Sequence, residues 1–473
     1  MLVVLKILKL FGTAGIRLKY PDEINPSLAY KIGLAIGSLK LSNKSIIVRD
    51  SRNTGQILSL SIALGLIAMG IDVYDIGLAP TPVAAYHARK KGGIGISVTA
   101  SHNPPEYNGF KFYDIEGFEF TRNLERIIEE RVDSDIKLND WRNIGRFREE
   151  QELLEEYIEN LLINIGEVRR NWEPYIIIDI GNGSAGHVTP RVLKAIGCKP
   201  IVLNANPDGF FPTRPPEPRK DVLETYVNLR IHRDTAAVLA HDGDADRLAA
   251  IDYKYGFIKQ DRLIALFATE ILERRRGVII VSVDTGRVVD EIAERYGVKI
   301  ERYALGKTHE RVKELGLNNV ALAAEPWKLI DPAWGPWVDG VWEAALLTKI
   351  IVESGKTLSE VLDERRIREY PWFRVSYLID PYEKRNVIYE NIVEELKVKL
   401  GEPVRIIDID GYRFEYPDES WILIRMSGTE PKIRIYSEAL SIDRLREISS
   451  TVDKLFLDIV KKNNARIVEK TIG

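Results

Sequence analysis

One pattern occurs three times in this sequence and constrains its fold more than any other feature. Each copy has a run of β-branched residues, an aspartate at its end, a loop, an amphipathic helix, a glycine and a second strand; the aspartates are Asp50, Asp179 and Asp284. Continuous isoleucine and valine runs indicate strands covered on both faces, and the strand–helix–strand order indicates parallel neighbours with right-handed crossovers. A repeat decides the architecture before any single motif does, so the sequence predicts three related α/β domains.

The repeat ends near Tyr370, where a different kind of domain begins. Closely spaced strands occupy residues 404–438, with a helical segment before them and another after them. Strands separated by short turns are typical of an antiparallel α+β domain. The acidic segment 149–162 is expected to be a helix that connects the first two domains. We therefore expect three related mixed α/β domains and a smaller C-terminal α+β domain over residues 1–150, 151–254, 255–368 and 369–473.

The composition favours small molecules as partners. The net charge is −3 over 473 residues and the two signs are interspersed, so there is no basic stripe for a nucleic-acid backbone. No transmembrane segment is found, and the apolar run 1–11 is interpreted as a strand. The single cysteine, Cys198, fits a reducing cytosol, since it cannot form an internal disulfide. We expect a cytoplasmic protein without nucleic-acid or membrane partners, and the sequence leaves its oligomeric state open.

The first segment that indicates chemistry is "SVTASHNPPEYNGFKFY", residues 97–113. An apolar strand ends there and delivers Ser101 to a loop at its C-terminal end, the edge of a parallel sheet where ligands bind. A serine at this place can be a nucleophile or a phosphate carrier if a base, a lowered pKa or a metal activates it. A serine–asparagine turn closed by Pro104 and Pro105 explains the same residue types equally well.

The second segment is "VLAHDGDADRLAAID", residues 238–252. Asp242, Asp244 and Asp246 alternate with small residues, so in an extended loop their carboxylates face one way. Hard oxygen ligands select Mg²⁺, Ca²⁺ or Mn²⁺. An EF-hand is excluded because its sixth and twelfth positions hold Arg247 and Tyr253. The sequence favours a Mg²⁺ site here over an aspartate-rich turn that caps a helix.

The third segment, residues 425–434, lies in the C-terminal domain and combines guanidinium groups, hydroxyls and an open backbone, a combination that suits a dianionic phosphate. Its candidate phosphate ligands are Arg425, Ser427, Gly428, Thr429 and Arg434. No Walker-type or G-x-G-x-x-G loop occurs, so a nucleotide is not indicated. A surface hairpin with scattered arginines is the alternative for this segment taken alone.

Taken together, four segments resemble the α-D-phosphohexomutases, the phosphoglucomutase/phosphomannomutase group, over essentially the whole chain. They are "FGTAGIR" at 11–17, "TASHNP" at 99–104, "DGDADR" at 242–247 and "RMSGTEPKIR" at 425–434. The resemblance implies four domains arranged around a central cleft. It also implies a phosphoryl group carried by Ser101, with Mg²⁺ bound by that group and the three aspartates.

The resemblance further implies the reaction. The phosphoryl group passes to a hexose 1-phosphate or 6-phosphate, and the resulting hexose 1,6-bisphosphate turns around before its other phosphate returns to Ser101. Arg247 would neutralise charge on the group in transfer, as phosphoryl-transfer sites do. Lys111 and His102 are candidates for acid–base catalysis or charge support, with simple orientation of the loop the alternative for His102. Arg17 is expected to point into the cleft.

One segment departs from the family pattern. Where the family has a sugar-binding G-E-x-S-G loop, this chain has "AAEPWKLI", which retains Glu325 but places Trp327 at the serine's position and Lys328 at the next glycine's. Tryptophans here and in residues 331–344 can stack on a sugar ring or fill apolar gaps. Lys307 is a further expected substrate contact. The sugar preference therefore does not follow from the resemblance.

The sequence thus predicts a Mg²⁺-dependent phosphohexomutase, an isomerase of glucose or mannose phosphates, with hexose 1,6-bisphosphate as intermediate or activator. The alternatives are a phosphoglucosamine mutase and a non-catalytic regulator that binds sugar phosphates. The fourth domain is expected to swing over the ligand, because its phosphate loop must reach the substrate end that is distant from Ser101.

Overall fold

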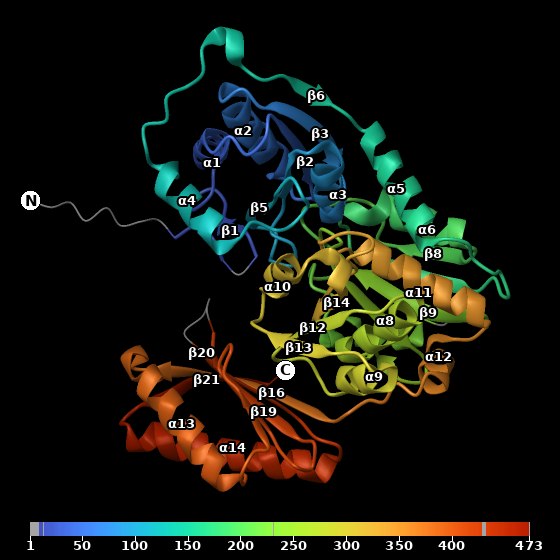
Figure 1. Cartoon of the computed structure of the whole chain (residues 1–473), viewed down its shortest axis with the longest axis vertical. Coiled ribbons are helices and arrows are strands. Elements are labelled where there is room, and N and C mark those ends of the chain that lie inside the picture. The colour runs from blue at the N-terminus through green and yellow to red at the C-terminus, as the bar shows by residue number, and fades with distance from the viewer. Residues whose placement is uncertain (1–8, 13, 230, 428–431, 473) are drawn as a thin grey trace, which may run out of the picture.

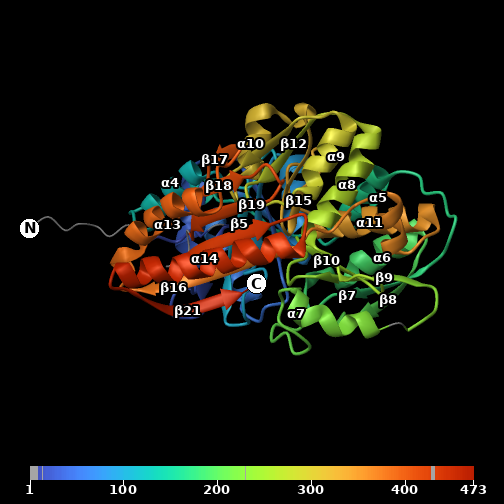
Figure 2. The ribbon, with the colours of Figure 1, turned by 90° about the horizontal axis from the view of Figure 1, so that it is seen from below.

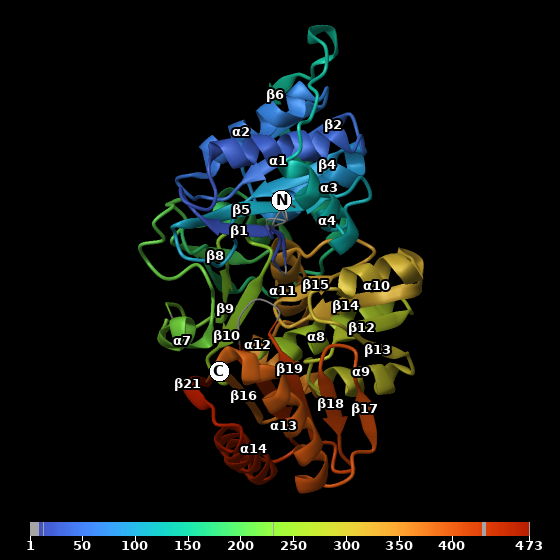
Figure 3. The same cartoon turned by 90° about the vertical axis from the view of Figure 1, so that its left-hand side faces the viewer.

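The computed structural model describes residues 9–12, 14–229, 231–427 and 432–472, and its strands form four sheets. The first sheet lies at one end of the molecule and the last at the other, with the second and third between them (Figures 1 and 3). This arrangement confirms the predicted fold class. The domain boundaries given above stay a prediction, and residues 1–8 of the predicted N-terminal strand lie outside the described residues. None of the helices in the described ranges is long and apolar enough to cross a membrane.

The first domain has a six-stranded mixed sheet with helices packed against it. Its strands are β1 (Ile16–Lys19), β2 (Lys44–Arg49), β3 (Asp72–Leu78), β4 (Ile94–Val98), β5 (Tyr107–Tyr113) and β6 (Phe147–Glu149). Its helices are α1 (Pro26–Ser38), α2 (Gly55–Ala68), α3 (Thr81–Lys91) and α4 (Arg122–Val132). The Asn25 side chain caps α1 by accepting a hydrogen bond from the Leu28 amide at 3.1 Å, just before the Pro26 that suits a first helical turn.

The second and third domains follow the same plan. After the connecting helix α5 (Glu152–Ile165), the second contains β7 (Tyr175–Asp179), α6 (Thr189–Ile196), β8 (Lys199–Leu203), α7 (Lys220–Leu223), β9 (Thr235–His241), β10 (Leu248–Asp252) and β11 (Gly256–Phe257). The third contains α8 (Gln260–Arg274), β12 (Val278–Ser282), α9 (Val288–Tyr296), β13 (Ile300–Tyr303), α10 (Thr308–Leu315), β14 (Val320–Glu325), β15 (Lys328–Ile330), α11 (Gly340–Ser354) and α12 (Leu358–Glu364). Helix α5 occupies the place of the acidic helix predicted over 149–162.

A four-stranded core is common to these three sheets. Its strand orders are β3-β2-β4-β5, β8-β7-β9-β10 and β13-β12-β14-β15. In each, the first strand of the repeat lies between two parallel neighbours, and the last two strands form an antiparallel hairpin. The central strands are buried on both faces, as their isoleucine and valine runs predict.

The fourth domain is an antiparallel sheet with two helices. Its elements are β16 (Trp372–Asp380), α13 (Arg385–Lys399), β17 (Arg405–Ile407), β18 (Tyr412–Glu415), β19 (Trp421–Met426), β20 (Lys432–Glu438), α14 (Ile442–Lys462) and β21 (Arg466–Ile472). Helices α13 and α14 pack side by side against the sheet (Figure 2). Tyr377 of β16 stacks on Phe456 of α14 with ring centroids 3.7 Å apart. The antiparallel sheet agrees with the prediction from the short turns, whereas the places of β16 beside β20 and of β21 beside β16 were not predicted.

An aromatic cluster holds the first three domains together. Trp334 stacks on Tyr86 of α3 with centroids 5.2 Å apart, and its ring lies 5.8 Å from that of Trp337 and 5.8 Å from that of Tyr157 on α5. The Tyr157 hydroxyl and the Trp334 indole both donate to the buried carboxylate of Asp339. Both tryptophans are buried, so they fill the core between domains and are not sugar-stacking residues.

Candidate active site

The predicted site residues of the first three domains occupy equivalent loops of the repeat. Each follows the third strand of the common core: Ser101 lies between β4 and β5, the three aspartates between β9 and β10, and Glu325 at the end of β14 before β15. Because the three sheets share one topology, the same hairpin reaches the same edge of each sheet. The repeat therefore explains why three segments more than 70 residues apart in sequence occupy equivalent positions.

Ser101 is fully buried, and its hydroxyl points at the loop between β9 and β10 that holds the three aspartates, the predicted metal loop. Its Oγ donates a hydrogen bond to Oδ2 of Asp242 at 2.8 Å, and its amide donates to Oγ1 of Thr99 at 2.7 Å. Its φ is +52°, in the left-handed region that side chains other than glycine seldom adopt. Backbone strain of this kind gathers at functional loops, where the surroundings enforce it.

The three aspartates gather in one buried cluster, as predicted. Asp242, Asp244 and Asp246 each offer a carboxylate oxygen, and these oxygens lie within 4.8 Å of one another. The Lys111 ammonium donates to Oδ2 of Asp244 at 2.7 Å and also to Oδ2 of Asp246. Oδ1 of Asp244 and Oδ1 of Asp246 are buried and have no hydrogen-bond partner among the described residues.

The surroundings act differently on the carboxylates of the cluster. Burial, and then repulsion from Asp244 and Asp246, raises the pKa of Asp242 well above its ordinary value. Burial opposes ionisation of Asp246 too, but Lys111 and Arg247 outweigh it and lower its pKa. The same carboxylates outweigh the burial of Lys111 and raise its pKa. Three converging carboxylates with two unpartnered oxygens fit a hard divalent cation such as Mg²⁺.

A cleft of about 840 Å³ opens beside this cluster and is cationic. Each domain contributes a positive side chain to its lining: Arg17, Arg247, Lys328 and Arg434 in chain order. The acidic side chains in the lining are those of Glu217 and Glu325. A cleft of this size can hold a sugar with its phosphates, and guanidinium and ammonium groups are the natural partners of phosphate oxygens.

His102 and Arg17 lie together at the wall of the cleft. Nδ1 of His102 is 3.4 Å from the Ser101 hydroxyl and 3.4 Å from Nη1 of Arg17, which also donates to Oδ1 of Asn103 at 3.3 Å. Burial, followed by the positive charges of Arg247 and Arg17, lowers the pKa of His102 far below its ordinary value. The imidazole is therefore neutral near pH 7 and is suited to hydrogen bonding.

Some of the other predicted ligands line the cleft and others do not. Glu325 lines it, but its carboxylate already accepts hydrogen bonds from the Gly306 amide at 2.9 Å and the Thr308 hydroxyl at 2.8 Å. Trp327 packs against Phe257, with ring centroids 5.9 Å apart, and is not among the residues that line the cleft.

Lys307 is also absent from the lining, although its neighbours Leu305 and Gly306 belong to it. Arg425 forms an ion pair with Asp410 at 2.8 Å. Arg434 lines the cleft. Ser427 ends the described part of the phosphate segment, and its backbone amide donates to the Lys432 carbonyl at 2.9 Å. Gly428 and Thr429 lie outside the described residues.

Among the charged residues of the lining, sequence reasoning did not assign Lys9, Glu217 and Lys328 to the cleft. Lys328 stands where the family pattern has a glycine, and the departure itself could have been read as an added cation. Glu217 lies 3.7 Å from Arg247, between their charged groups, and comes from a proline-rich loop that carried no motif. The signal for Lys328 was present in the sequence, whereas the contact of Glu217 depends on how its loop folds back.

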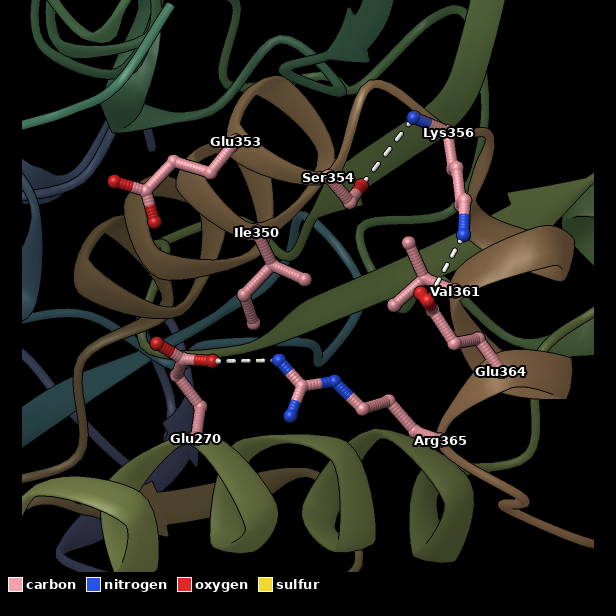
Figure 4. Close-up of a pocket in the computed structure, with 8 residues that line it drawn as sticks. All are labelled: Glu270, Ile350, Glu353, Ser354, Lys356, Val361, Glu364 and Arg365. Atoms are coloured by element: carbon pink, nitrogen blue, oxygen red, sulfur yellow. Dashed lines mark hydrogen bonds and ion pairs between the residues drawn. The ribbon is translucent and has the colours of Figure 1, made fainter. Parts of the chain in front are cut away.

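A second cavity, of about 380 Å³, lies between α8, α11 and α12 (Figure 4). Its charged side chains pair across the opening: Arg365 is 3.6 Å from Glu270, and Lys356 is 2.9 Å from Glu364. None of the predicted site residues lines it. This cavity is therefore separate from the predicted site.

Comparisons with known proteins identify the family. Family models of phosphoglucomutase/phosphomannomutase α/β/α domains I, II and III match residues 8–139, 155–256 and 259–368, and the model of the C-terminal domain matches residues 383–455. A phosphopentomutase of Thermococcus kodakarensis is 37% identical, over 96% of this chain and all of that protein. A probable phosphoglucosamine mutase of Methanopyrus kandleri is 35% identical, over 96% and 98%.

A solved structure supports the same assignment. The phosphoglucomutase/phosphomannomutase family protein of Burkholderia thailandensis has a TM-score of 0.83 and 26% identity, over 96% of this chain and 98% of that one. Matches to all four domain models cover most of the sequence, and the relatives match along their full length. The chain therefore belongs to the phosphoglucomutase/phosphomannomutase family of the α-D-phosphohexomutase superfamily.

Proposed function

We propose that this protein is a Mg²⁺-dependent phosphohexomutase that interconverts the 1-phosphate and 6-phosphate of glucose or mannose through a phosphoserine at Ser101. The observation that carries the proposal is the position of the Ser101 hydroxyl, 2.8 Å from the buried aspartate cluster and beside a cationic cleft to which all four domains contribute. A protein that only bound sugar phosphates would need the cations but neither the serine nor the aspartates.

The aspartates and the phosphoryl group on Ser101 would hold Mg²⁺, which neutralises charge on a phosphoryl group in transfer. In the first half-reaction, the bond between phosphorus and Ser101 Oγ breaks and a bond to a sugar hydroxyl forms. The proton of that hydroxyl must reach Ser101 Oγ, with Lys111 and His102 as candidates to assist. In the second half-reaction the hexose 1,6-bisphosphate has turned around, and its other phosphoryl group returns to Ser101.

The remaining residues act on charge and orientation. Arg247 lies 3.9 Å from Asp242 and 4.0 Å from Asp246, where its guanidinium can accompany the phosphoryl group without displacing the cluster. Lys111, whose pKa is raised, supports charge as a cation. Arg17 and His102 would orient the group on Ser101, and Glu325 would contact sugar hydroxyls. Arg434, with Arg425, Ser427, Gly428 and Thr429, would bind the phosphate distant from Ser101.

The test is a panel of sugar phosphates given to the wild type and to Ser101→Ala, with Mg²⁺ and a catalytic amount of hexose 1,6-bisphosphate. We expect isomerisation of glucose or mannose 1-phosphate by the wild type and a complete loss in the variant. Ribose 1-phosphate and glucosamine 1-phosphate belong in the panel because the two relatives described above are named for such substrates. An alanine variant as active as the wild type would overturn the proposal.

Two other outcomes separate the alternatives. Tight binding of a hexose phosphate without isomerisation of any sugar would identify a regulator, and release of free sugar and phosphate would identify a phosphatase. Preferred turnover of glucosamine 1-phosphate would assign the protein to the phosphoglucosamine mutases. The lysine at position 328 adds a cation where the family pattern has glycine, so the panel is read together with Lys328→Gly.

A further inference from the structure

Arg52 is an arginine with a fully buried side chain, and it forms hydrogen bonds with the loop between β4 and β5 that carries Ser101, the serine loop. The hydrogen bonds of its guanidinium go to that loop and to Asp50. Nη1 donates to the carbonyls of Pro104 at 2.6 Å and Tyr107 at 2.7 Å. Nη2 donates to the carbonyls of Ser101 at 3.0 Å and Asn103 at 2.6 Å. Nε donates to Oδ2 of Asp50 at 3.0 Å, and neither side chain of this pair is exposed.

The same group of residues also fixes the amide of Ser101. Oδ2 of Asp50 accepts a hydrogen bond from the Thr99 hydroxyl at 2.6 Å, and Oγ1 of Thr99 accepts one from the Ser101 amide at 2.7 Å. Both backbone polar groups of Ser101 are thus held by a network that starts at Asp50, the first of the three repeated aspartates. A non-glycine residue at φ +52° persists when its surroundings enforce it, and here the enforcing contacts are identified.

We propose that Arg52 is a positioning residue that sets the conformation of the serine loop, so that the Ser101 hydroxyl faces Asp242. This inference rests on the proposed role of Ser101 as phosphoryl carrier. Arg52 does not touch the substrate cleft, and it acts through four carbonyl groups of the loop. A planar guanidinium donates in several fixed directions and can bind four carbonyl groups at once, whereas the ammonium of a lysine is a compact charge that cannot reach all of them.

The second repeat contains the same arrangement and supports the inference independently. Arg214 forms an ion pair with Asp179, the second repeated aspartate, and its Nη2 donates to the carbonyl of His241 at 2.6 Å. His241 is the residue directly before the metal triad. In both repeats a buried aspartate therefore directs an arginine to the backbone of the functional loop.

One aromatic ring lies between Arg52 and the loop that follows His241. The Arg52 guanidinium carbon lies 5.2 Å from the centre of the Phe211 ring, and a side chain added at Gly243 would come within 3.4 Å of that ring. Gly243 belongs to the metal loop, so Phe211 packs between Arg52 and that loop. The position of Ser101 is thereby linked to the position of its metal-binding partner.

The experiment compares Arg52→Lys with Arg262→Lys in the full-length protein. Arg262 is a matched control because it is also buried and also divides its guanidinium between a carboxylate, that of Glu369 at 3.1 Å, and a carbonyl, that of Ile367 at 3.1 Å, but it lies outside the cleft lining. We expect Arg52→Lys to lower kcat by about 100-fold with KM nearly unchanged, because small displacements of reacting groups have effects of this size. Arg262→Lys should keep kcat within about two-fold of the wild type.

A second measurement follows the serine itself. The rate at which hexose 1,6-bisphosphate phosphorylates Ser101, read by intact mass, should fall in Arg52→Lys in parallel with kcat. Thr99→Val removes the acceptor for the Ser101 amide and, with it, the hydroxyl that donates to Asp50. It should show the same pattern with a loss of about 10-fold, and it carries the test if Arg52→Lys does not fold. Equal kcat values for Arg52→Lys and Arg262→Lys, or a normal phosphorylation rate in Thr99→Val, would overturn the positioning role.

The outcomes are distinguishable from a failure of the proposed function. If Ser101→Ala turns over substrate like the wild type, the phosphoserine proposal fails. If Ser101→Ala is inactive and Arg52→Lys is fully active, only the positioning role fails.

Discussion

Lys111 lies between Asp244 and Asp246 and supplies part of the positive charge that a divalent ion would bring to the cluster. Removing one partner of a buried ion pair leaves an uncompensated charge, which typically costs about 3–5 kcal/mol. We therefore expect Lys111→Met to lower the free energy of unfolding by about that amount in EDTA. The measurement is urea unfolding followed by circular dichroism.

Mg²⁺ should restore part of this loss, since ligand at about 100 times its Kd stabilises a folded protein by about 2.7 kcal/mol. Lys31→Met is the control, because its ion pair with Asp133 is exposed and such pairs contribute about 0–1 kcal/mol. A Lys111→Met variant that is equally destabilised with and without Mg²⁺ would contradict a shared role of the lysine and the ion.

At the scale of residues, the sequence predicted groups that carry their own signal. Alternating aspartates, and a serine at the end of an apolar strand, predict a polar cluster without any knowledge of the surrounding packing. In the structure Ser101 does form a hydrogen bond with Asp242. Arg52 carried no such signal, because its partners are backbone carbonyls, which every residue possesses. Trp327 carried an ambiguous signal, because its position suits a sugar ligand and its ring suits an apolar contact; in the structure the ring packs against Phe257.

At the scale of elements, helix α11 packs against the loop that holds the three aspartates. It begins at Gly340, and a Cβ added there would lie 2.6 Å from the Arg247 carbonyl oxygen and 2.9 Å from that of Ala245. We expect Gly340→Ala to displace the loop, lower the free energy of unfolding by about 1–3 kcal/mol as overpacking does, and reduce kcat by about 100-fold. Calorimetry and the coupled mutase assay measure the two effects.

Gly55→Ala is the matched control, because Gly55 is also the first residue of a helix and the nearest atom to its added Cβ is 3.5 Å away. Alanine should there stabilise the protein by up to about 1 kcal/mol and leave the activity unchanged. Equal effects of the two substitutions would show that the metal loop does not depend on the contact with α11.

The contact between α3 and α5 should make stability depend on pH. His87 of α3 is buried, with Nε2 2.7 Å from the Leu153 carbonyl and Nδ1 4.0 Å from Glu156. Burial lowers the pKa of His87 from 6.5 to about 4. Between these two pH values the imidazole binds a proton in the unfolded chain but not in the folded protein. This contribution to stability is present above pH 6.5 and is lost as the pH falls toward 4.

Comparison with His87→Gln isolates this effect. Between about pH 7.5 and about pH 5, the wild type should lose about 2 kcal/mol of unfolding free energy relative to the variant. The comparison is necessary because Glu125, whose pKa burial raises to about 7, contributes in the opposite direction over part of the same range. A difference between the two proteins that stays constant with pH would contradict the assignment.

The elements themselves were the most predictable part of the molecule. The repeated strand–aspartate–helix order fixed the parallel neighbours, and the short turns after Tyr370 fixed the antiparallel domain. The side on which a tryptophan packs was not predictable, because an indole ring suits a sugar and an apolar core equally well. Only the docking of α3 and α5 against residues 334–339 decides that Trp334 and Trp337 belong to the core.

At the scale of the whole molecule, strand β20 connects the cleft to the contact between the third and fourth domains. Arg434 on this strand lines the cleft, and Glu438 at its end is buried against the third domain. The Glu438 carboxylate accepts hydrogen bonds from the Lys259 ammonium, the Arg287 amide at 2.7 Å and the Trp421 indole at 3.1 Å. A rotation of the fourth domain about this contact would carry Arg434 toward or away from a bound phosphate.

We therefore expect Glu438→Gln to loosen the fourth domain. The substitution keeps the shape of the side chain but removes one charge from a buried ion pair, and Lys259 retains only Asp261, at 3.1 Å, as its described acidic partner. The radius of gyration of the ligand-free variant, from small-angle scattering, should exceed that of the wild type. If the C-terminal domain binds the phosphate distant from Ser101, as proposed, hexose 1,6-bisphosphate should shrink both proteins toward one value.

The control for this experiment is Asp443→Asn, which removes an exposed ion pair with Arg446 in the same domain and should leave the radius unchanged. Glu438→Gln also separates the contribution of domain closure to KM from the contribution of the site around Ser101. If domain closure contributes binding energy, Glu438→Gln should raise KM for hexose phosphate while the rate of Ser101 phosphorylation by saturating bisphosphate stays near that of the wild type. An identical radius for all three proteins, with and without ligand, would mean that the fourth domain is fixed, and Arg434 would then bind phosphate without any closing motion.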